Sequence, residues 1–125
     1  MTAAEVWGQQ LSFTDSQDYP GLHTTVLQDG RIAMTWRESG GVIKAQTLNV
    51  DGTLNGPIIT VYASASATAS SPKIVTLADG NFAISYWTYN PTDNVDGINV
   101  AIYNPSGVQQ SNNPIHTMRH ESYTG

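Results

Sequence analysis

The segment formed by residues 90–97 holds the side chains best suited to binding chemistry. Asp93, Asn94 and Asp96 stand just before Gly97. Carboxylate and amide oxygens are the ligands that a hard cation such as Ca²⁺ takes in proteins. The segment lacks the distal glutamate and the full aspartate spacing of an EF-hand loop. The sequence therefore predicts either a calcium site at these three residues or a plain polar loop, and it predicts no other cofactor.

Large aromatic residues lie on both sides of this segment. Trp87 and Tyr89 precede it, and Tyr103 follows it. Aromatic rings can cover the C–H face of a sugar, while neighbouring carboxylates and amides bind its hydroxyl groups. Together, the aromatic and polar residues define a candidate glycan site: Trp87, Tyr89, Asp93, Asn94, Asp96 and Tyr103. Packing within the fold is the alternative role for these aromatic residues.

No arrangement of residues predicts an enzyme. Serine is plentiful, but no G-x-S-x-G motif occurs, and His23, His116 and His120 have no evident partner pattern. A glycosidase needs two placed carboxylates. Four of the ten acidic residues have a simpler role, because they directly precede glycine, as is typical of turns: Asp29, Asp51, Asp79 and Asp96. We therefore expect a non-catalytic protein.

The elements that would position these side chains belong to an internal repeat. Residues 27–36 return as residues 77–86, with Leu, Asp, Gly and Ala unchanged. The match continues from residues 43–49 to residues 98–104, where five extra residues have increased the offset from 50 to 55. Trp36 and Tyr86 recur at one position, which indicates a packing role. A period of about 50 residues predicts a stacked repeat architecture such as a propeller or solenoid.

Each repeat is expected to contain four antiparallel strands. Runs rich in β-branched and aromatic residues alternate with Asp-Gly or Ser-Gly pairs, which are hairpin signals. Type I′ turns, with positive φ at both central residues, are expected at the Asp-Gly pairs. The predicted turn residues are Asp29, Gly30, Asp51, Gly52, Asp79, Gly80 and Gly107. Four short antiparallel strands make one propeller blade, so the predicted fold class is an all-β, β-propeller type.

The predicted domain organisation is two blades in a permuted frame. Residues 1–21 are expected to form a terminal strand that completes a neighbouring blade, residues 22–71 the first blade and residues 72–125 the second. Residues 63–71, which are small, are expected to cross between the blades. Closed propellers have about four to eight blades. The sequence thus predicts that copies of the chain associate head to tail into a homo-oligomeric ring.

Composition excludes several classes of partner. Charged residues make up 12% of the 125 residues and the net charge is −5, so a nucleic acid partner is not expected. No apolar run approaches the length of a transmembrane helix, and we expect no membrane insertion. The N-terminus has neither the basic region nor the apolar region of a signal peptide. Cysteine is absent, which excludes disulfides and thiolate chemistry.

The repeat pattern L-x-D-G-x-x-A-x-x-W, followed by Ala45-Gln46 and an Asp-Gly turn, resembles repeats of large secreted bacterial proteins, including RTX-type adhesins. The resemblance implies a β-propeller-like, non-catalytic protein at an extracellular or cell-surface location. The chain departs from these proteins in having two copies of the repeat and no glycine-aspartate nonapeptides. The functional prediction is a structural or adhesive module that assembles into a ring. The alternatives are a small oligomeric lectin with sites between blades and a calcium-binding segment of a large secreted adhesin.

Overall fold

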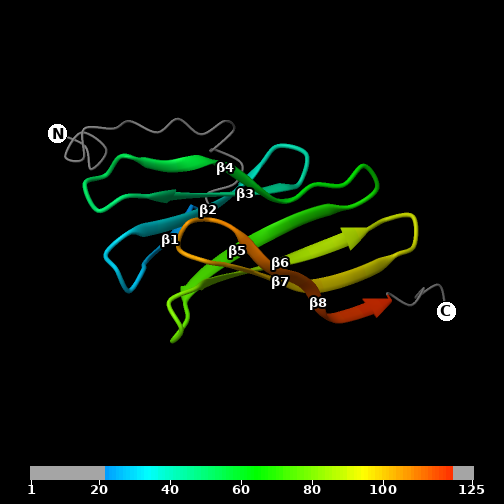
Figure 1. Cartoon of the computed structure of the whole chain (residues 1–125). Coiled ribbons are helices and arrows are strands. Elements are labelled where there is room, and N and C mark those ends of the chain that lie inside the picture. The colour runs from blue at the N-terminus through cyan, green and yellow to red at the C-terminus, as the bar shows by residue number, and fades with distance from the viewer. Residues whose placement is uncertain (1–21, 120–125) are drawn as a thin grey trace.

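The computed structural model describes residues 22–119, and every regular element in this range is a β-strand (Figure 1). The first sheet has the antiparallel order β1-β2-β3-β4, and the second has the order β5-β6-β7-β8. The strands of the first sheet are β1 (His23–Val26), β2 (Ile32–Glu38), β3 (Val42–Leu48) and β4 (Leu54–Tyr62). Those of the second sheet are β5 (Thr68–Thr76), β6 (Phe82–Asn90), β7 (Val95–Tyr103) and β8 (Gln109–Arg119). The predicted all-β class is confirmed, and neither sheet closes on itself within the described residues.

Four hairpin connections share one tight turn, which ends in a left-handed glycine. In the connection from β1 to β2, the Leu27 N–H donates to the Arg31 carbonyl at 2.7 Å. The Gly30 N–H donates back to the Leu27 carbonyl at 3.0 Å. Asp29 Oδ1 accepts the Arg31 N–H at 3.0 Å, which fixes the aspartate within the turn. The glycines at the four equivalent positions all have positive φ: Gly30 (+93°), Gly52 (+87°), Gly80 (+92°) and Gly107 (+86°).

The type I′ geometry predicted for these turns is wrong at the aspartates. Among residues 22–119, the non-glycine residues with positive φ are Ser71 and Asn94, so the aspartates keep negative φ. Three residues rather than two lie between the hydrogen-bonded Leu27 and Arg31. A three-residue loop of this kind needs only one left-handed residue, at its last position. The aspartate instead accepts a backbone hydrogen bond from the residue two positions later.

Strand alternation gives each sheet an inner face, toward the other sheet, and an outer face. The inner faces build one buried cluster, which includes Ala33 and Ile43 from the first sheet and Phe82 and Ile84 from the second. Large aromatic contacts reinforce it, because the rings of Phe82 and Tyr103 stack with centroids 5.5 Å apart. The outer face of the first sheet carries a separate buried cluster of Met34, Trp36 and Leu48.

The two inner faces are not equivalent to each other. Gly30 and Gly80 occupy the same turn position 50 residues apart, so Ala33 corresponds to Ala83 and Met34 to Ile84. Ala33 and Ile84 belong to the shared cluster, whereas Met34 belongs to the outer cluster of its own sheet. The sheets therefore contact each other through opposite faces of equivalent strands, which is a head-to-tail arrangement.

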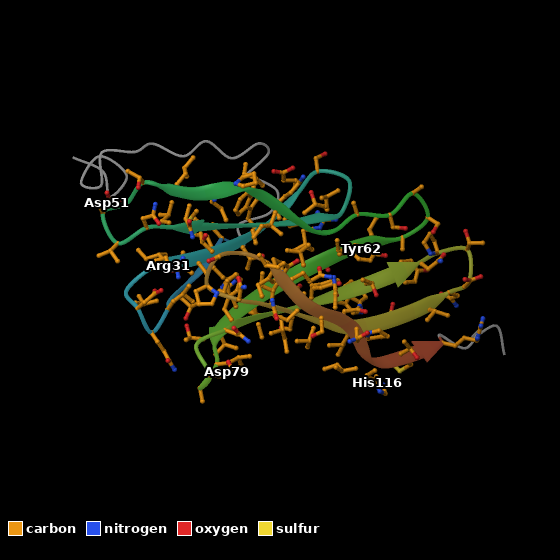
Figure 2. All side chains as sticks on the ribbon, in the orientation of Figure 1. Arg31, Asp51, Tyr62, Asp79 and His116 are labelled. Atoms are coloured by element: carbon orange, nitrogen blue, oxygen red, sulfur yellow. The ribbon has the colours of Figure 1, made fainter. Side chains whose placement is uncertain are left out.

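Polar groups also link the two sheets. The Tyr86 hydroxyl donates to Asn112 Oδ1 at 2.6 Å, and Asn112 Nδ2 donates to the Val61 carbonyl at 3.0 Å. The Tyr86 ring lies 5.5 Å from the ring of Tyr62, which Figure 2 labels. Arg37 Nε donates to the Ala69 carbonyl at 2.6 Å. These contacts fix the relative position of the sheets as well as filling the space between them.

The crossing between the sheets is shorter than predicted. Residues 63–67 connect β4 to β5, and residues 68–71 already belong to β5, with Ser71 within a register shift. The predicted boundary between residues 71 and 72 therefore falls inside a strand. The terminal strand predicted at residues 1–21 lies outside the described residues. Within residues 22–119 there is no helix with the length and hydrophobicity needed to cross a membrane.

Candidate functional site

The five extra residues of the second repeat lengthen a hairpin. The equivalent hairpin of the first sheet ends at the pair Glu38–Val42, whereas β6 and β7 continue to the pair Asn90–Val95. The loop predicted at residues 90–97 is therefore only a four-residue turn, residues 91–94. Asp96 and Gly97 lie within β7, because each added pair of residues extends the ladder of backbone hydrogen bonds.

Side chains of the hairpin itself hold this turn in place. Asn90 Oδ1 accepts the Thr92 N–H at 2.9 Å, and Asn90 Nδ2 donates to Asp93 Oδ2 at 3.4 Å. The Tyr89 hydroxyl donates to Asn94 Oδ1 at 3.1 Å. Two of the three proposed calcium ligands are thus engaged within the turn, and Asp96 lies on the strand that follows it. Calcium binding stays a prediction for these residues.

The outer face of the second sheet presents an aromatic surface beside a small pocket. Trp87 pairs with Ile98, which pairs with His116, and this row runs across β6, β7 and β8. The neighbouring row contains Tyr89, Asp96 and Met118. The Trp87 and Tyr89 rings stack with centroids 6.4 Å apart and an interplanar angle of 21°. Both rows lie at the end of the sheet near the β6–β7 turn, and Figure 2 labels His116 there.

The pocket combines apolar walls with a carboxylate. It is lined by Trp87, Asp96, Gly97, Ile98, His116 and Met118. Trp87 is 42% exposed and Ile98 43% exposed, whereas Asp96 is only 8% exposed. An exposed aromatic face beside a recessed carboxylate can bind a ligand that has both an apolar face and hydrogen-bond donors. Ile98, His116 and Met118 were missed as site residues by sequence reasoning, because only the register of β6, β7 and β8 places them on the same face as Trp87.

Tyr103 is separated from the other candidate ligand residues. It lies in the cluster between the sheets, with its ring on Phe82 and its hydroxyl 3.2 Å from Gln109 Oε1. Burial raises the pKa of the Tyr103 hydroxyl to about 12. Burial likewise raises the pKa of Tyr86, and the hydrogen bond to Asn112 opposes that shift. Trp87, Tyr89 and Asp96 thus share one face of the sheet, and Tyr103 packs on the other.

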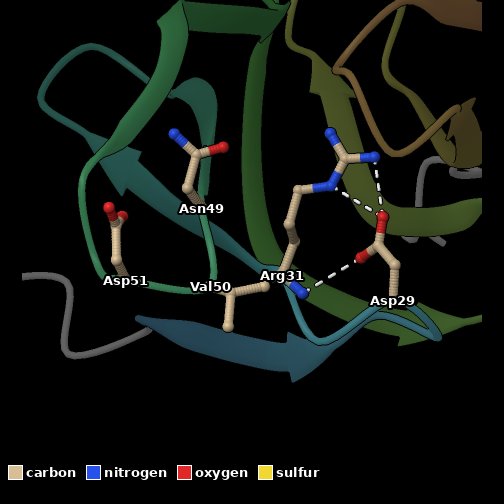
Figure 3. A pocket seen from close by; sticks show the side chains of 5 residues that line it. All are labelled: Asp29, Arg31, Asn49, Val50 and Asp51. Carbon is tan, nitrogen blue, oxygen red and sulfur yellow. Dashed lines mark hydrogen bonds and ion pairs between the residues drawn. The ribbon is translucent and has the colours of Figure 1, made fainter.

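An open groove lies at one end of the first sheet, between two of the tight turns (Figure 3). Asp29, Arg31, Asn49, Val50 and Asp51 line it. Arg31 Nη2 lies 2.7 Å from Asp29 Oδ2, and hydrogen bonds from the Arg31 side chain and backbone lower the pKa of Asp29. Hydrogen bonds from the Thr53 hydroxyl and backbone N–H lower the pKa of Asp51. The charged side chains of this groove therefore already make hydrogen bonds that stabilise its two turns.

Metal-ligating residues do not gather in the part of the chain that the structure describes: residues 22–119 contain no group of three His, Cys, Asp or Glu able to hold an ion. Comparison with protein-family models, curated proteins and solved structures finds no match for this chain. Its function is therefore inferred from its own contacts. The two features that bear on function are the head-to-tail packing of the sheets and the exposed outer face of the second sheet.

Proposed function

We propose that the chain is a non-catalytic module of the β-propeller type, with a structural or adhesive role outside the cell, whose copies join head to tail into a closed ring. The observation that carries this proposal is the contact between the two sheets through opposite faces of equivalent strands. Within residues 22–119, a contact of this kind leaves the outer face of each sheet without a partner sheet, although Met34, Trp36 and Leu48 on the outer face of the first sheet are already buried. The two outer faces are counterparts of the two inner faces that already meet, so copies can repeat the same contact.

Exposed apolar residues support the proposal. Val75, Trp87 and Ile98 lie on the outer face of the second sheet and are 55%, 42% and 43% exposed. Trp87 holds the position that Arg37 holds in the first repeat, where Arg37 binds across the contact between the sheets. Trp87 and Ile98 are cross-strand neighbours, and Val75 lies farther along the same face. Exposed apolar surface of this kind on a soluble protein marks an interaction site.

The test is the mass of the full chain in solution, measured by light scattering and native mass spectrometry. We expect a multiple of the 13.5 kDa chain mass, because two to four chains supply the roughly four to eight blades of a closed ring. Ile98→Glu should shift the population to monomer, since it places a charge on the outer face. Val108→Glu, at an exposed position beside a turn, serves as the matched control. A compact monomer at micromolar concentration would refute the proposal.

The second candidate function is carbohydrate binding, favoured by the stacked Trp87 and Tyr89 rings beside Asp96. An aromatic platform with a recessed carboxylate suits the apolar face and hydroxyl groups of a sugar. A glycan array with the wild-type chain and the Trp87→Ala and Asp96→Ala variants tests it, alongside a calcium titration. We expect binding that both substitutions weaken. A wild-type chain that binds neither glycan nor calcium would leave the structural role alone.

A further inference from the structure

We infer that the contact between copies is a head-to-tail joint in which β5 of one copy lies against β1 of the next, with Val75 facing Val26. The inference rests on the proposed function and specifies its interface. It excludes symmetric contacts, in which two copies meet through the same face.

The template for this joint is the contact between β1 and β5 inside the chain. The hydroxyl oxygens of Thr25 and Thr76 lie 2.9 Å apart. Thr76 Oγ1 also lies 2.8 Å from the Val26 carbonyl and donates to it. Gln28 Nε2 donates to the Ala78 carbonyl at 2.8 Å, beside the next turn. The two edge strands are thus held together at the same end of both sheets.

The residues of the repeat that correspond to this contact lie on the outer faces of the two sheets. With an offset of 50, Val75 is the counterpart of Thr25, and Val26 is the counterpart of Thr76. Val75 pairs with Ala83, and Val26 pairs with Ile32. Both valines therefore lie on the faces that do not meet within the chain. If a second copy follows the first as the second sheet follows the first within one chain, Val75 of one copy lies against Val26 of the other.

The inner contact and its outer counterpart use different side chains, and the difference fits their locations. Inside the chain, the Thr76 hydroxyl donates to the Val26 carbonyl and accepts from the Thr25 hydroxyl, so both hydroxyl groups are hydrogen-bonded. At the outer positions, the chain has valines that are 55% and 65% exposed. Valine has the shape of threonine but no polar group, so two valines make a dry contact that is favoured only when a partner covers them.

A second transferred contact lies at the opposite edge of the sheets. Inside the chain, Asn55 Nδ2 lies 3.4 Å from the Pro105 carbonyl and donates to it. The strand register makes Ser111 the counterpart of Asn55, and the shared turn makes Val50 the counterpart of Pro105. Val50 is 71% exposed. The joint between copies would therefore have two contacts. At one edge β5 of one copy meets β1 of the next, and at the other edge β8 of one copy meets the β3–β4 turn of the next.

Disulfide trapping tests the joint, because the chain has no cysteine of its own. Val26→Cys and Val75→Cys are prepared as separate full-length chains, mixed in equal amounts and oxidised in air. We expect a covalent dimer in the mixture and none with either chain alone. The Thr25→Cys, Thr76→Cys double variant is the positive control, and it should form the disulfide within one chain. Circular dichroism confirms that each variant is folded.

The outcomes separate this inference from the proposed function. Covalent dimers from Val75→Cys alone, or from Val26→Cys alone, would show a symmetric contact and overturn the inference while the assembly stands. An oligomer by light scattering that gives no covalent dimer in the mixture would place the joint elsewhere and also overturn it. A monomer by light scattering would instead refute the proposed function. A Val26→Cys, Val75→Cys double variant that becomes a closed covalent ring would support both.

Discussion

At the scale of single residues, the left-handed glycines set the shape of the hairpins. Gly30 and Gly80 have φ near +90°, which a β-branched side chain resists. We expect Gly30→Val and Gly80→Val each to lower the free energy of unfolding by about 1–3 kcal/mol. A Cβ at Gly30 would meet Val50 Cγ2 at an ordinary 3.4 Å, so backbone strain rather than a clash causes the loss.

Urea denaturation of both glycine variants measures this effect. Gly30→Asn is the matched control, because asparagine tolerates the left-handed region, and it should lose less stability than Gly30→Val. Equal unfolding midpoints for the valine variants and the wild type would contradict the turn assignment.

The turn aspartates predict a dependence of stability on pH. Hydrogen bonds lower the folded-state pKa of Asp29 and Asp51 below the ordinary value of 3.8. Their contribution to the free energy of unfolding is therefore complete at pH values well above 3.8, and it is lost as the pH falls through the lower folded-state pKa. We expect the urea midpoint to fall as the pH is lowered from about 5 to about 2, and to fall less in the Asp29→Asn, Asp51→Asn variant. An equal fall in both proteins would show that other groups cause it.

At the scale of elements, Asn112 on β8 joins the second sheet to the first. It accepts the Tyr86 hydroxyl and donates to the Val61 carbonyl, so Asn112→Ala leaves both groups without this partner. We expect a loss of about 1–3 kcal/mol in the free energy of unfolding. Asn113→Ala is the matched control: Asn113 is exposed on the other face of the same strand, and its replacement should cost less than about 0.5 kcal/mol. Similar losses in the two variants would argue against the link.

At the scale of the whole molecule, association should couple to stability. Because copies bind only when folded, the ring predicts a melting temperature that rises over roughly two decades of chain concentration. Calorimetry across that range measures the effect, with Ile98→Glu as the control that should remove it. A melting temperature independent of concentration in both proteins would contradict assembly through the outer face of the second sheet.

The amino-acid sequence by itself determined the local features of this protein. The repeat, the number and direction of the strands and the positions of the turn glycines follow from side-chain alternation and turn chemistry. Trp36 and Tyr86, which recur at one position, are both buried as packing residues should be. These features depend on residues close together in the chain, so a single sequence contains them.

Only the tertiary structure decided which side chains share a face and which faces meet. Alternation divides residues between two sides of a strand, but it does not say which side meets the other sheet. Tyr103 therefore joined the core between the sheets, while Trp87 stayed outside. Pairing of β7 with β8 brought His116 to the pocket beside Trp87, although 29 residues separate the two in the chain. Contacts at such separation depend on the packing of whole sheets, which local patterns do not specify.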